Sequence, residues 1–211
     1  MKKQRIVAFD ILGPTYHYDG AEGWKEDEGA VRTLLNKIKE LGYEPKTAEE
    51  ESFVEEEIVR EGKADIYITP GFVETVLYTQ KEGALPIIVS AGTQGCFELG
   101  LEAAVRDYRD RTGERVSAEQ LFPEELRLST VGVGSKKKAE TWAGMVQERF
   151  GDAKVLATYE DTFGNMEAAM EGLDCDGYFV VAQPSGLVTL EKRIYKGTMQ
   201  ELMPTLAEKL K

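Results

Sequence analysis

Four short segments of this 211-residue chain carry side chains that can attack, hold or neutralise a phosphate group. Each segment lies where an apolar run ends or where a helical pattern begins. They comprise Asp10; Ser90 with Ala91-Gly92-Thr93; Lys138 within the run Lys136-Lys137-Lys138; and the group Glu160, Asp161 and Asn165. One such segment would be weak evidence, but four in this order predict a site for phosphoryl transfer.

Asp10 and Ser90 can supply the first two parts of that chemistry. A carboxylate at the end of a strand can attack phosphorus and form an aspartyl-phosphate, which divides one hydrolysis into two easier displacements. Ser90 precedes a small-residue turn and a helix, so its hydroxyl and the N–H groups that follow can bind phosphate oxygens. Each residue alone is also typical of an ordinary turn or helix start, so the prediction depends on the whole set.

Lys138 lies in the first turn of an expected helix over residues 138–150, where the helix dipole disfavours a positive charge. A lysine run at that place indicates an anionic ligand held nearby. A solvated, lysine-rich turn would explain the same residues. Lys136 and Lys137 are rivals to Lys138, because the spacing does not decide which of the three faces the site.

Three oxygen-bearing side chains, Glu160, Asp161 and Asn165, follow the apolar run at residues 155–158. Mg²⁺ is a hard cation that proteins usually hold with one or two carboxylates, together with substrate oxygens and water. A simple helix cap would explain Asp161 but not the other two residues. The group therefore predicts a Mg²⁺ site.

The apolar runs before these residues are short and unalternating, and amphipathic helical patterns separate them. This pattern is typical of strands buried on both faces, so we predict an α/β fold with a doubly wound parallel sheet, whose ligands bind beyond the carboxyl ends of the strands. The expected strands cover residues 5–9, 86–89, 126–131, 155–158 and 178–182, the last of these being the last clear strand. The expected helices cover residues 31–41, 47–61, 72–82, 97–111, 138–150, 166–170 and a C-terminal stretch opened by a Thr198–Glu201 capping box.

Composition narrows the classes of protein further. Acidic residues outnumber basic ones by 38 to 26, and this net charge of −12 argues against a nucleic-acid surface and calls for a cation beside an anionic substrate. Cys96 and Cys175 have no metal-type spacing, and we expect free thiols. The chain has no signal-like apolar region and no stretch of membrane-spanning length, so we expect a soluble, cytoplasmic protein that binds no membrane.

Two glutamate triplets, at residues 49–51 and 55–57, lie around Phe53 and Ile58 in the expected helix over residues 47–61. We interpret this segment as a solvated helix with one apolar edge rather than as an acidic binding patch.

Four aromatic or imidazole side chains lie shortly after Asp10. They are Tyr16, His17, Tyr18 and Trp24. Such side chains could contact a substrate, but packing at a hinge is the commoner role. His17, the single histidine, could donate a proton, although a lone loop histidine is usually incidental.

Together the four segments resemble the motifs of the haloacid dehalogenase-like hydrolase superfamily, and the resemblance covers most of the chain. That family has a nucleophilic Asp after a hydrophobic strand, a Ser or Thr at the end of another strand, a Lys, and an acidic cluster before a helix. Residues 160–169, Glu-Asp-Thr-Phe-Gly-Asn-Met-Glu-Ala-Ala, are the most specific match. The resemblance implies, for catalysis, Asp10 and Lys138; for phosphate binding, Ser90, Ala91 and Lys138; and for Mg²⁺, Asp10, the backbone carbonyl of Leu12, Asp161 and Asn165.

The same resemblance implies the division of the chain. Residues 1–19 and 69–211 would form a Rossmann-like α/β core, and residues 20–68 would form a small helical cap inserted after the first strand. About fifty residues suffice only for a small cap, which would leave the entrance to the site fairly open.

The chain departs from the family pattern two residues after Asp10. Phosphatases of the family usually have a second Asp there, which serves as acid for the leaving group and base for the water, whereas this chain has Leu12. A leucine cannot transfer a proton, and positioned acid–base groups typically contribute ~10²–10⁴-fold. Phosphonatases and dehalogenases of the family also lack that Asp. The dehalogenases work without a metal, so the acidic pair Glu160 and Asp161 disfavours them.

We therefore expect a Mg²⁺-dependent hydrolase, a phosphatase that acts on a small phosphorylated metabolite through an aspartyl-phosphate at Asp10. One alternative is a hydrolase of the phosphonatase or dehalogenase type. The other is a non-catalytic binding subunit, which Leu12 makes plausible.

Overall fold

The computed structural model describes residues 3–18, 29–131, 135–184, 186–191 and 193–211, with side chains for all of these except residues 135–139 and 191. Within the described residues, seven strands form one sheet in the order β5-β4-β1-β6-β7-β9-β8. In chain order these strands are β1 (Arg5–Phe9), β4 (Leu85–Ser90), β5 (Arg127–Ser129), β6 (Lys154–Glu160), β7 (Asp176–Val180), β8 (Val188–Glu191) and β9 (Ile194–Gly197).

The sheet is parallel except at one edge. β1 lies between β4 and β6, and Ala8 is paired in parallel register with both Ile87 and Thr158. Among the described strands of this sheet, only β8 runs antiparallel, against its neighbour β9. Because β1, β4 and β6 run side by side in one direction, the residues that follow them meet at one edge of the sheet. The predicted α/β fold with a doubly wound parallel sheet is therefore confirmed, with β8 as an antiparallel strand added at one edge.

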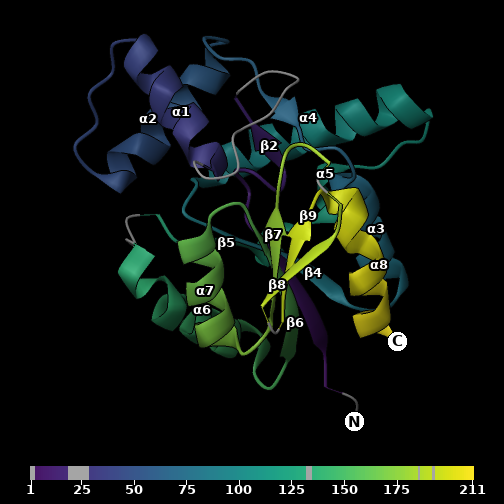
Figure 1. Cartoon of the computed structure of the whole chain (residues 1–211). Helices are drawn as coiled ribbons and strands as arrows, with labels where there is room; N and C mark the ends of the chain where they lie inside the picture. Colours follow the sequence, from purple (N-terminus) through teal and green to yellow (C-terminus); the bar gives the residue numbers. More distant parts are fainter. Residues whose placement is uncertain (1–2, 19–28, 132–134, 185, 192) are drawn as a thin grey trace.

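Helices cover both faces of this sheet (Figure 1). They are α1 (Gly29–Glu40), α2 (Ala48–Arg60), α3 (Phe72–Lys81), α4 (Gln94–Thr112), α5 (Ala118–Leu121), α6 (Ser135–Phe150), α7 (Phe163–Leu173) and α8 (Met199–Leu210), with a 3₁₀ turn at Glu124–Leu126. One face packs against α3, α4, α5 and α8, and the other packs against α6 and α7. In β1, Val7 and Phe9 point to the first face and Ile6 and Ala8 to the second, so every residue of the run must be apolar.

The helices α1 and α2 lie apart from these two layers, beyond the carboxyl ends of the strands (Figure 1). They pack on each other through a small apolar cluster that includes Leu34, Ile38 and Ile58. Thr47 caps α2 by accepting a hydrogen bond from the N–H of Glu50 at 3.1 Å. A two-stranded ribbon, β2 (Tyr16–His17) with β3 (Tyr67–Ile68), lies where the chain enters and leaves this helical segment.

The structure corrects several predicted boundaries. The stretch at residues 178–182 is not the last strand, because β9 and β8 follow it and complete the sheet. Helix α6 begins at Ser135 and α7 at Phe163, each three residues earlier than predicted. The capping box between Thr198 and Glu201 is confirmed, with both reciprocal hydrogen bonds formed.

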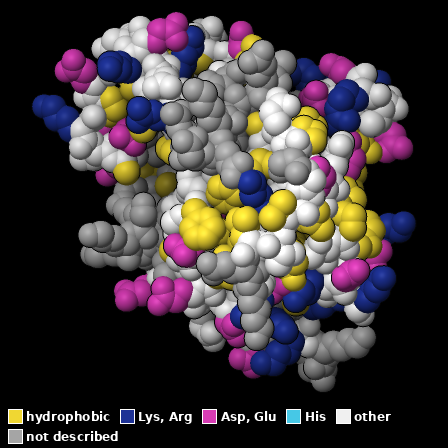
Figure 2. Space-filling view, in the orientation of Figure 1, with side chains coloured by type: hydrophobic (Ala, Val, Ile, Leu, Met, Phe, Trp, Pro, Cys, Tyr) yellow, Lys and Arg dark blue, Asp and Glu magenta, His cyan; other side chains and the backbone are white. Residues whose placement is uncertain are grey.

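Cys96 and Cys175 are both free, as predicted, and both are buried. Among the described helices, none combines the length and the apolar character needed to cross a bilayer. Figure 2 shows apolar side chains gathered on the middle of the face that carries β8. Leu187, Val188 and Leu190 are the exposed apolar residues of that edge.

Candidate active site

A cavity of about 320 Å³ lies at the carboxyl ends of β1, β4 and β6. Its floor comes from the residues that follow these strands, and its roof comes from α1 and α2. The floor is Asp10, Ile11, Leu12, Ser90, Ala91, Gly92, Asp161, Thr162 and Asn165, and the roof is Val31, Leu34, Ala48, Glu51, Ser52 and Glu55. The structure thus brings Asp10, Leu12, Ser90, Ala91, Asp161 and Asn165 around one space.

Asp10 is held firmly at the end of β1. Its backbone N–H donates to the carbonyl of Tyr159 at 3.0 Å, which continues the pairing with β6 for one more residue. Its carboxylate Oδ1 accepts a bond from the N–H of Ile11 at 2.8 Å. The side chain is 5% exposed and borders the cavity. A carboxylate fixed in this way has little orientational freedom to lose when it attacks a bound group.

Three buried carboxylates meet beneath the cavity. Asp10, Glu160 and Asp161 can each offer an oxygen so that all three atoms lie within 4.8 Å of one another. Negative charges this close and this far from water repel strongly unless a cation lies among them. An all-oxygen set of this kind fits a hard divalent ion such as Mg²⁺. Asn165, in the first turn of α7, borders the same cavity and can add an amide oxygen.

Asp161 also fixes the start of α1. Its Oδ2 accepts a hydrogen bond from the backbone N–H of Ala30, in the first turn of that helix. The loop after β1 passes directly over Asp161 at Gly13. A Cβ on Gly13 would lie 2.4 Å from the Cβ of Asp161, and Gly13 has φ +89°, so only glycine suits this crossing. Asp161 therefore links the floor of the cavity to its roof.

The turn after β4 leads into α4, and its residues Ala91 and Gly92 border the cavity. Thr93 is the N-cap of α4, and its side chain accepts from the N–H of Cys96 at 3.1 Å. Ser129 Oγ donates to the carbonyl of Gly92 at 2.7 Å and fixes the turn from the β5 side. Ser90 is 3% exposed and borders the cavity together with Ala91. Such a helix start, with a serine before it, is suited to hold an anion.

The lysine predictions lie partly outside the described residues. Lys136, Lys137 and Lys138 fall in the first turn of α6, but their side chains are among those that the structure does not describe. The assignment of Lys138 to the site stays a prediction. Trp24 likewise lies outside the described residues.

Leu12 and His17 have different surroundings. Leu12 borders the cavity and packs against two apolar clusters, so the position at which the family has an acid is occupied here by an apolar wall. His17 belongs to β2 and stacks on the ring of Tyr67, with centroids 5.9 Å apart, away from the described lining of the cavity. Burial lowers the pKa of His17 to about 4. His17 is therefore neutral at neutral pH, and it is not the proton donor of this site.

The roof residues were not among the predicted site residues, and Glu55 lies in a different environment from the one predicted. Glu55, which was interpreted as part of a solvated helix face, is only 4% exposed and borders the cavity. The hydroxyls of Tyr16 and Tyr18 both donate to its Oε1, each at 2.8 Å. Its spacing was an available signal, because Glu55 lies three residues before Ile58 on the buried face of α2.

Burial raises the pKa of the Glu55 carboxyl, and the charge of Asp10 acts in the same direction. The two tyrosine hydroxyls favour the ionised form and oppose that shift. The pKa of Tyr16 is itself raised, chiefly by burial and then by the charge of Glu55, so its hydroxyl stays protonated and keeps donating.

Comparison with known proteins gives no family model and no curated protein that matches this sequence. Solved structures do match in fold. A haloacid dehalogenase-like family hydrolase from Xanthomonas campestris is 14% identical, with TM-score 0.57, over 100% of this chain and 97% of that one. A predicted phosphoglycolate phosphatase from Haemophilus somnus is 13% identical, with TM-score 0.53, over 98% and 99%. A dehalogenase is 14% identical, with TM-score 0.56, over 98% and 99%.

Proposed function

We propose that this chain, which has the fold of the haloacid dehalogenase-like hydrolases, is a Mg²⁺-dependent phosphatase that works through an aspartyl-phosphate at Asp10. One observation carries the proposal. A fixed carboxylate, a helix start suited to an anion and a cluster of acidic residues lie at a single cavity of small-molecule size. Any of the three alone would be ordinary, but phosphoryl transfer uses all of them together.

In this proposal the carboxylate of Asp10 attacks the phosphorus of a bound phosphoester. Ser90 and the backbone N–H groups after it hold two of the phosphoryl oxygens, and Lys138 neutralises their charge. The bond between phosphorus and the ester oxygen breaks, and the alcohol leaves toward the roof. Water then attacks the aspartyl-phosphate, which frees phosphate and restores the Asp10 carboxylate.

The metal would be held by Asp10, the backbone carbonyl of Leu12, Asp161 and Asn165, with Glu160 close by. When bound, Mg²⁺ would offset the repulsion between the phosphate and these carboxylates and would stabilise the charge that develops during transfer. The donor atoms of this cluster are all oxygens, which supports an activity that depends on a hard cation.

The roof also bears on the substrate. Residues 20–68 would act as a cap, and its described helices close the cavity with Val31, Leu34 and Ala48 beside the acids Glu51 and Glu55. An apolar and acidic roof disfavours a second anionic group on the leaving part. We propose a small phosphorylated metabolite whose only strong negative charge is its phosphate, met in the cytoplasm.

More than one kind of hydrolase shares this fold, since a dehalogenase as well as a predicted phosphoglycolate phosphatase is among the structures that match. Leu12 keeps open a phosphonatase-type or dehalogenase-type reaction and a binding role without turnover. The three buried carboxylates weigh against the metal-free dehalogenase.

The proposal is tested by following phosphate release from an aryl phosphate, first with Mg²⁺ and then with a chelator in excess. We expect metal-dependent release that Asp10→Asn abolishes, because the near-isosteric amide is not a competent nucleophile. Halide release from a 2-haloacid, or phosphate release from a phosphonate only, would replace the phosphatase by one of the other hydrolases. Phosphate binding without release of any product would indicate a binding subunit.

A further inference from the structure

We propose that Glu55, in the helical roof, is the general acid and base of this site and takes the role that Leu12 cannot perform. The inference rests on the proposed phosphatase function and assigns to it a catalytic residue from a different element. It stands on where the Glu55 carboxyl lies and on how it is held.

The Glu55 carboxyl is oriented by two hydroxyls. Tyr16 and Tyr18 come from the chain segment after β1, and both donate to Oε1 of Glu55 at 2.8 Å. Their rings meet edge to face with centroids 5.8 Å apart, and this packing restrains the positions of both hydroxyl oxygens. The Cys96 thiol is a third donor beside this carboxyl. Because both tyrosine bonds go to Oε1, we assign proton exchange to Oε2.

The tyrosines are themselves held by the core. The ring of Tyr16 lies against Gly100 of α4, where an added Cβ would meet a ring carbon at 2.4 Å. Tyr16 is 2% exposed. The thiol of Cys96, on the same helix, also lies beside Glu55. The carboxyl is therefore fixed from the core side although it belongs to α2.

Helix α2 is bonded to the turn that would hold the phosphate. Ser52, one turn before Glu55, donates through Oγ to the carbonyl of Ala91 at 3.0 Å. Thr93 donates through Oγ1 to Oε2 of Glu56 at 2.5 Å. These bonds fix the height of Glu55 above the floor of the cavity, and both Glu55 and Asp10 border that space. A leaving group that points from the floor to the roof would reach the Glu55 side chain.

The environment of Glu55 suits a group that gains and loses a proton. Burial and the charge of Asp10 favour the neutral acid, whereas the two tyrosine hydroxyls favour the carboxylate. With Oε1 accepting both tyrosine bonds, the proton of the neutral form belongs on Oε2. The surroundings thus stabilise both the neutral and the ionised form of the Glu55 carboxyl, and a group that gives up and regains a proton must adopt both.

The proposed steps balance as follows. Asp10 forms a bond to phosphorus while the bond from phosphorus to the ester oxygen breaks, and its electron pair goes to that oxygen. The proton on Oε2 of Glu55 passes to the same oxygen, so a neutral alcohol leaves. Glu55, now a carboxylate, takes a proton from the water that attacks phosphorus, and the bond to Asp10 breaks. Glu55 ends protonated, and the net change is hydrolysis.

The test compares two substrates whose leaving groups differ in their need for a proton. An activated aryl phosphate releases a stable phenolate, whereas a simple alkyl phosphate must release a protonated alcohol. We expect Glu55→Gln to lower kcat/KM for the alkyl phosphate by ~10²-fold or more and to lower it much less for the aryl phosphate. Gln can still accept both tyrosine hydrogen bonds through its amide oxygen, so the roof should keep its structure.

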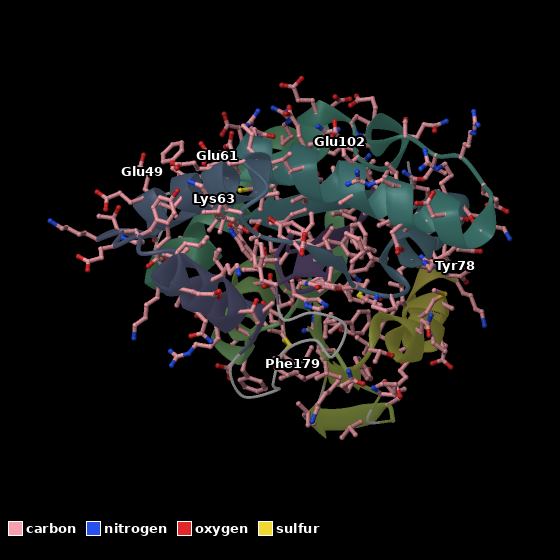
Figure 3. The ribbon with its side chains drawn as sticks, turned by 90° about the horizontal axis from the view of Figure 1, so that it is seen from above. Glu49, Glu61, Lys63, Tyr78, Glu102 and Phe179 are labelled. Carbon is pink, nitrogen blue, oxygen red and sulfur yellow. The ribbon has the colours of Figure 1, made fainter. Side chains whose placement is uncertain are left out.

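Glu49→Gln is the matched control. Glu49 lies on the same helix, is exposed and points outward at the edge of the molecule (Figure 3). The substitution Glu49→Gln changes the net charge as Glu55→Gln does, but far from the cavity. We therefore expect the wild-type kcat/KM for both substrates. Thermal unfolding of both variants checks the fold.

A second measurement needs no variant. For a series of phosphates with increasingly basic leaving groups, the kcat/KM of the wild type should change little, because the leaving oxygen is protonated as it departs. A steep loss of kcat/KM along the series would overturn the role of Glu55. So would an equal effect of Glu55→Gln on both substrates, even if Asp10→Asn still abolished hydrolysis. Survival of hydrolysis in Asp10→Asn would instead refute the proposed function itself.

Discussion

Asp161 serves two purposes, and substitutions can separate them. One oxygen caps α1 through the N–H of Ala30, and the residue also belongs to the acidic cluster. Asp161→Asn keeps an oxygen for the cap but removes the charge, so we expect weaker Mg²⁺ binding with little loss of stability. Asp161→Ala removes both and should cost about 1 kcal/mol more in the free energy of unfolding. Titration calorimetry measures the Mg²⁺ affinity of each variant, and denaturant unfolding measures its free energy of unfolding. Unchanged Mg²⁺ affinity in both variants would show that Asp161 is not part of the metal site.

Leu12 offers an independent check on Glu55. If Glu55 supplies the proton, Leu12→Asp should add little to the wild type but should restore alkyl phosphate turnover in a Glu55→Gln background by about 10-fold or more. The comparison is a double-mutant cycle, so stability losses from placing a charge against the apolar wall appear in both backgrounds. An equal gain in the two backgrounds would mean that the two positions do not share a role.

Strand ends were the most predictable part of the candidate site. Asp10, Ser90 and Asp161 each follow a buried apolar run, and parallel strands bring such ends to one edge, so their proximity could be predicted from the sequence. Glu55 could not be found in the same way. Its burial depends on Tyr16 and on α4, which are distant in sequence, and a glutamate triplet on a helix is usually solvated.

At the scale of elements, every described helix of ten residues or more was predicted at least in part, whereas β2, β3, α5, β8 and β9 were not predicted. Helices of ten residues or more carry several turns of apolar periodicity, whereas β2 and β3 have two residues each and take their pairing from the chain around them. β8 is an exposed edge strand with Leu190 at 42% exposure, so it lacks the buried pattern of the central strands. Arg193, with φ +76°, turns the chain between β8 and β9, and arginine has no preference that would mark such a turn.

The ribbon of β2 and β3 should make the protein sensitive to acid. His17 is buried with a pKa lowered to about 4, whereas the unfolded chain has a histidine near its ordinary value. At a pH between these two pKa values, the histidine of the unfolded state is protonated and that of the folded state is not. The folded state therefore loses stability relative to the unfolded state as the pH falls from neutral through this range. It amounts to about 2 kcal/mol between pH 7 and pH 5.

The variant His17→Phe should lose that part of the pH dependence while it keeps an aromatic ring against Tyr67. Denaturant unfolding at the two pH values measures the difference, and the wild type should lose more stability than the variant. Equal losses in the two proteins would show that His17 does not titrate between the folded and unfolded states as its burial implies.

At the scale of the whole molecule, both the net charge and the acidic residues of the candidate site indicate that a cation is needed. The chain has a net charge of −12, and part of this charge is concentrated at the candidate site, where three carboxylates lie within 4.8 Å of one another and Glu51 lies in the roof. A phosphate that enters this space is repelled by these carboxylates unless a cation and the start of α4 offset the repulsion. In this proposal, activity therefore depends on the metal for two reasons: the ligand residues can bind it, and the net negative charge of the protein requires a cation beside the phosphate.

The decisive measurement is the trapping of a phosphoryl group on the protein during turnover. The chain is mixed with Mg²⁺ and a small acyl or aryl phosphate, quenched in acid, and digested for mass spectrometry. We predict a phosphoryl adduct on the peptide that carries Asp10, lost when Mg²⁺ is chelated and absent from Asp10→Asn. Phosphate release without any adduct, or an adduct on a different residue that persists in Asp10→Asn, would contradict the aspartyl-phosphate mechanism.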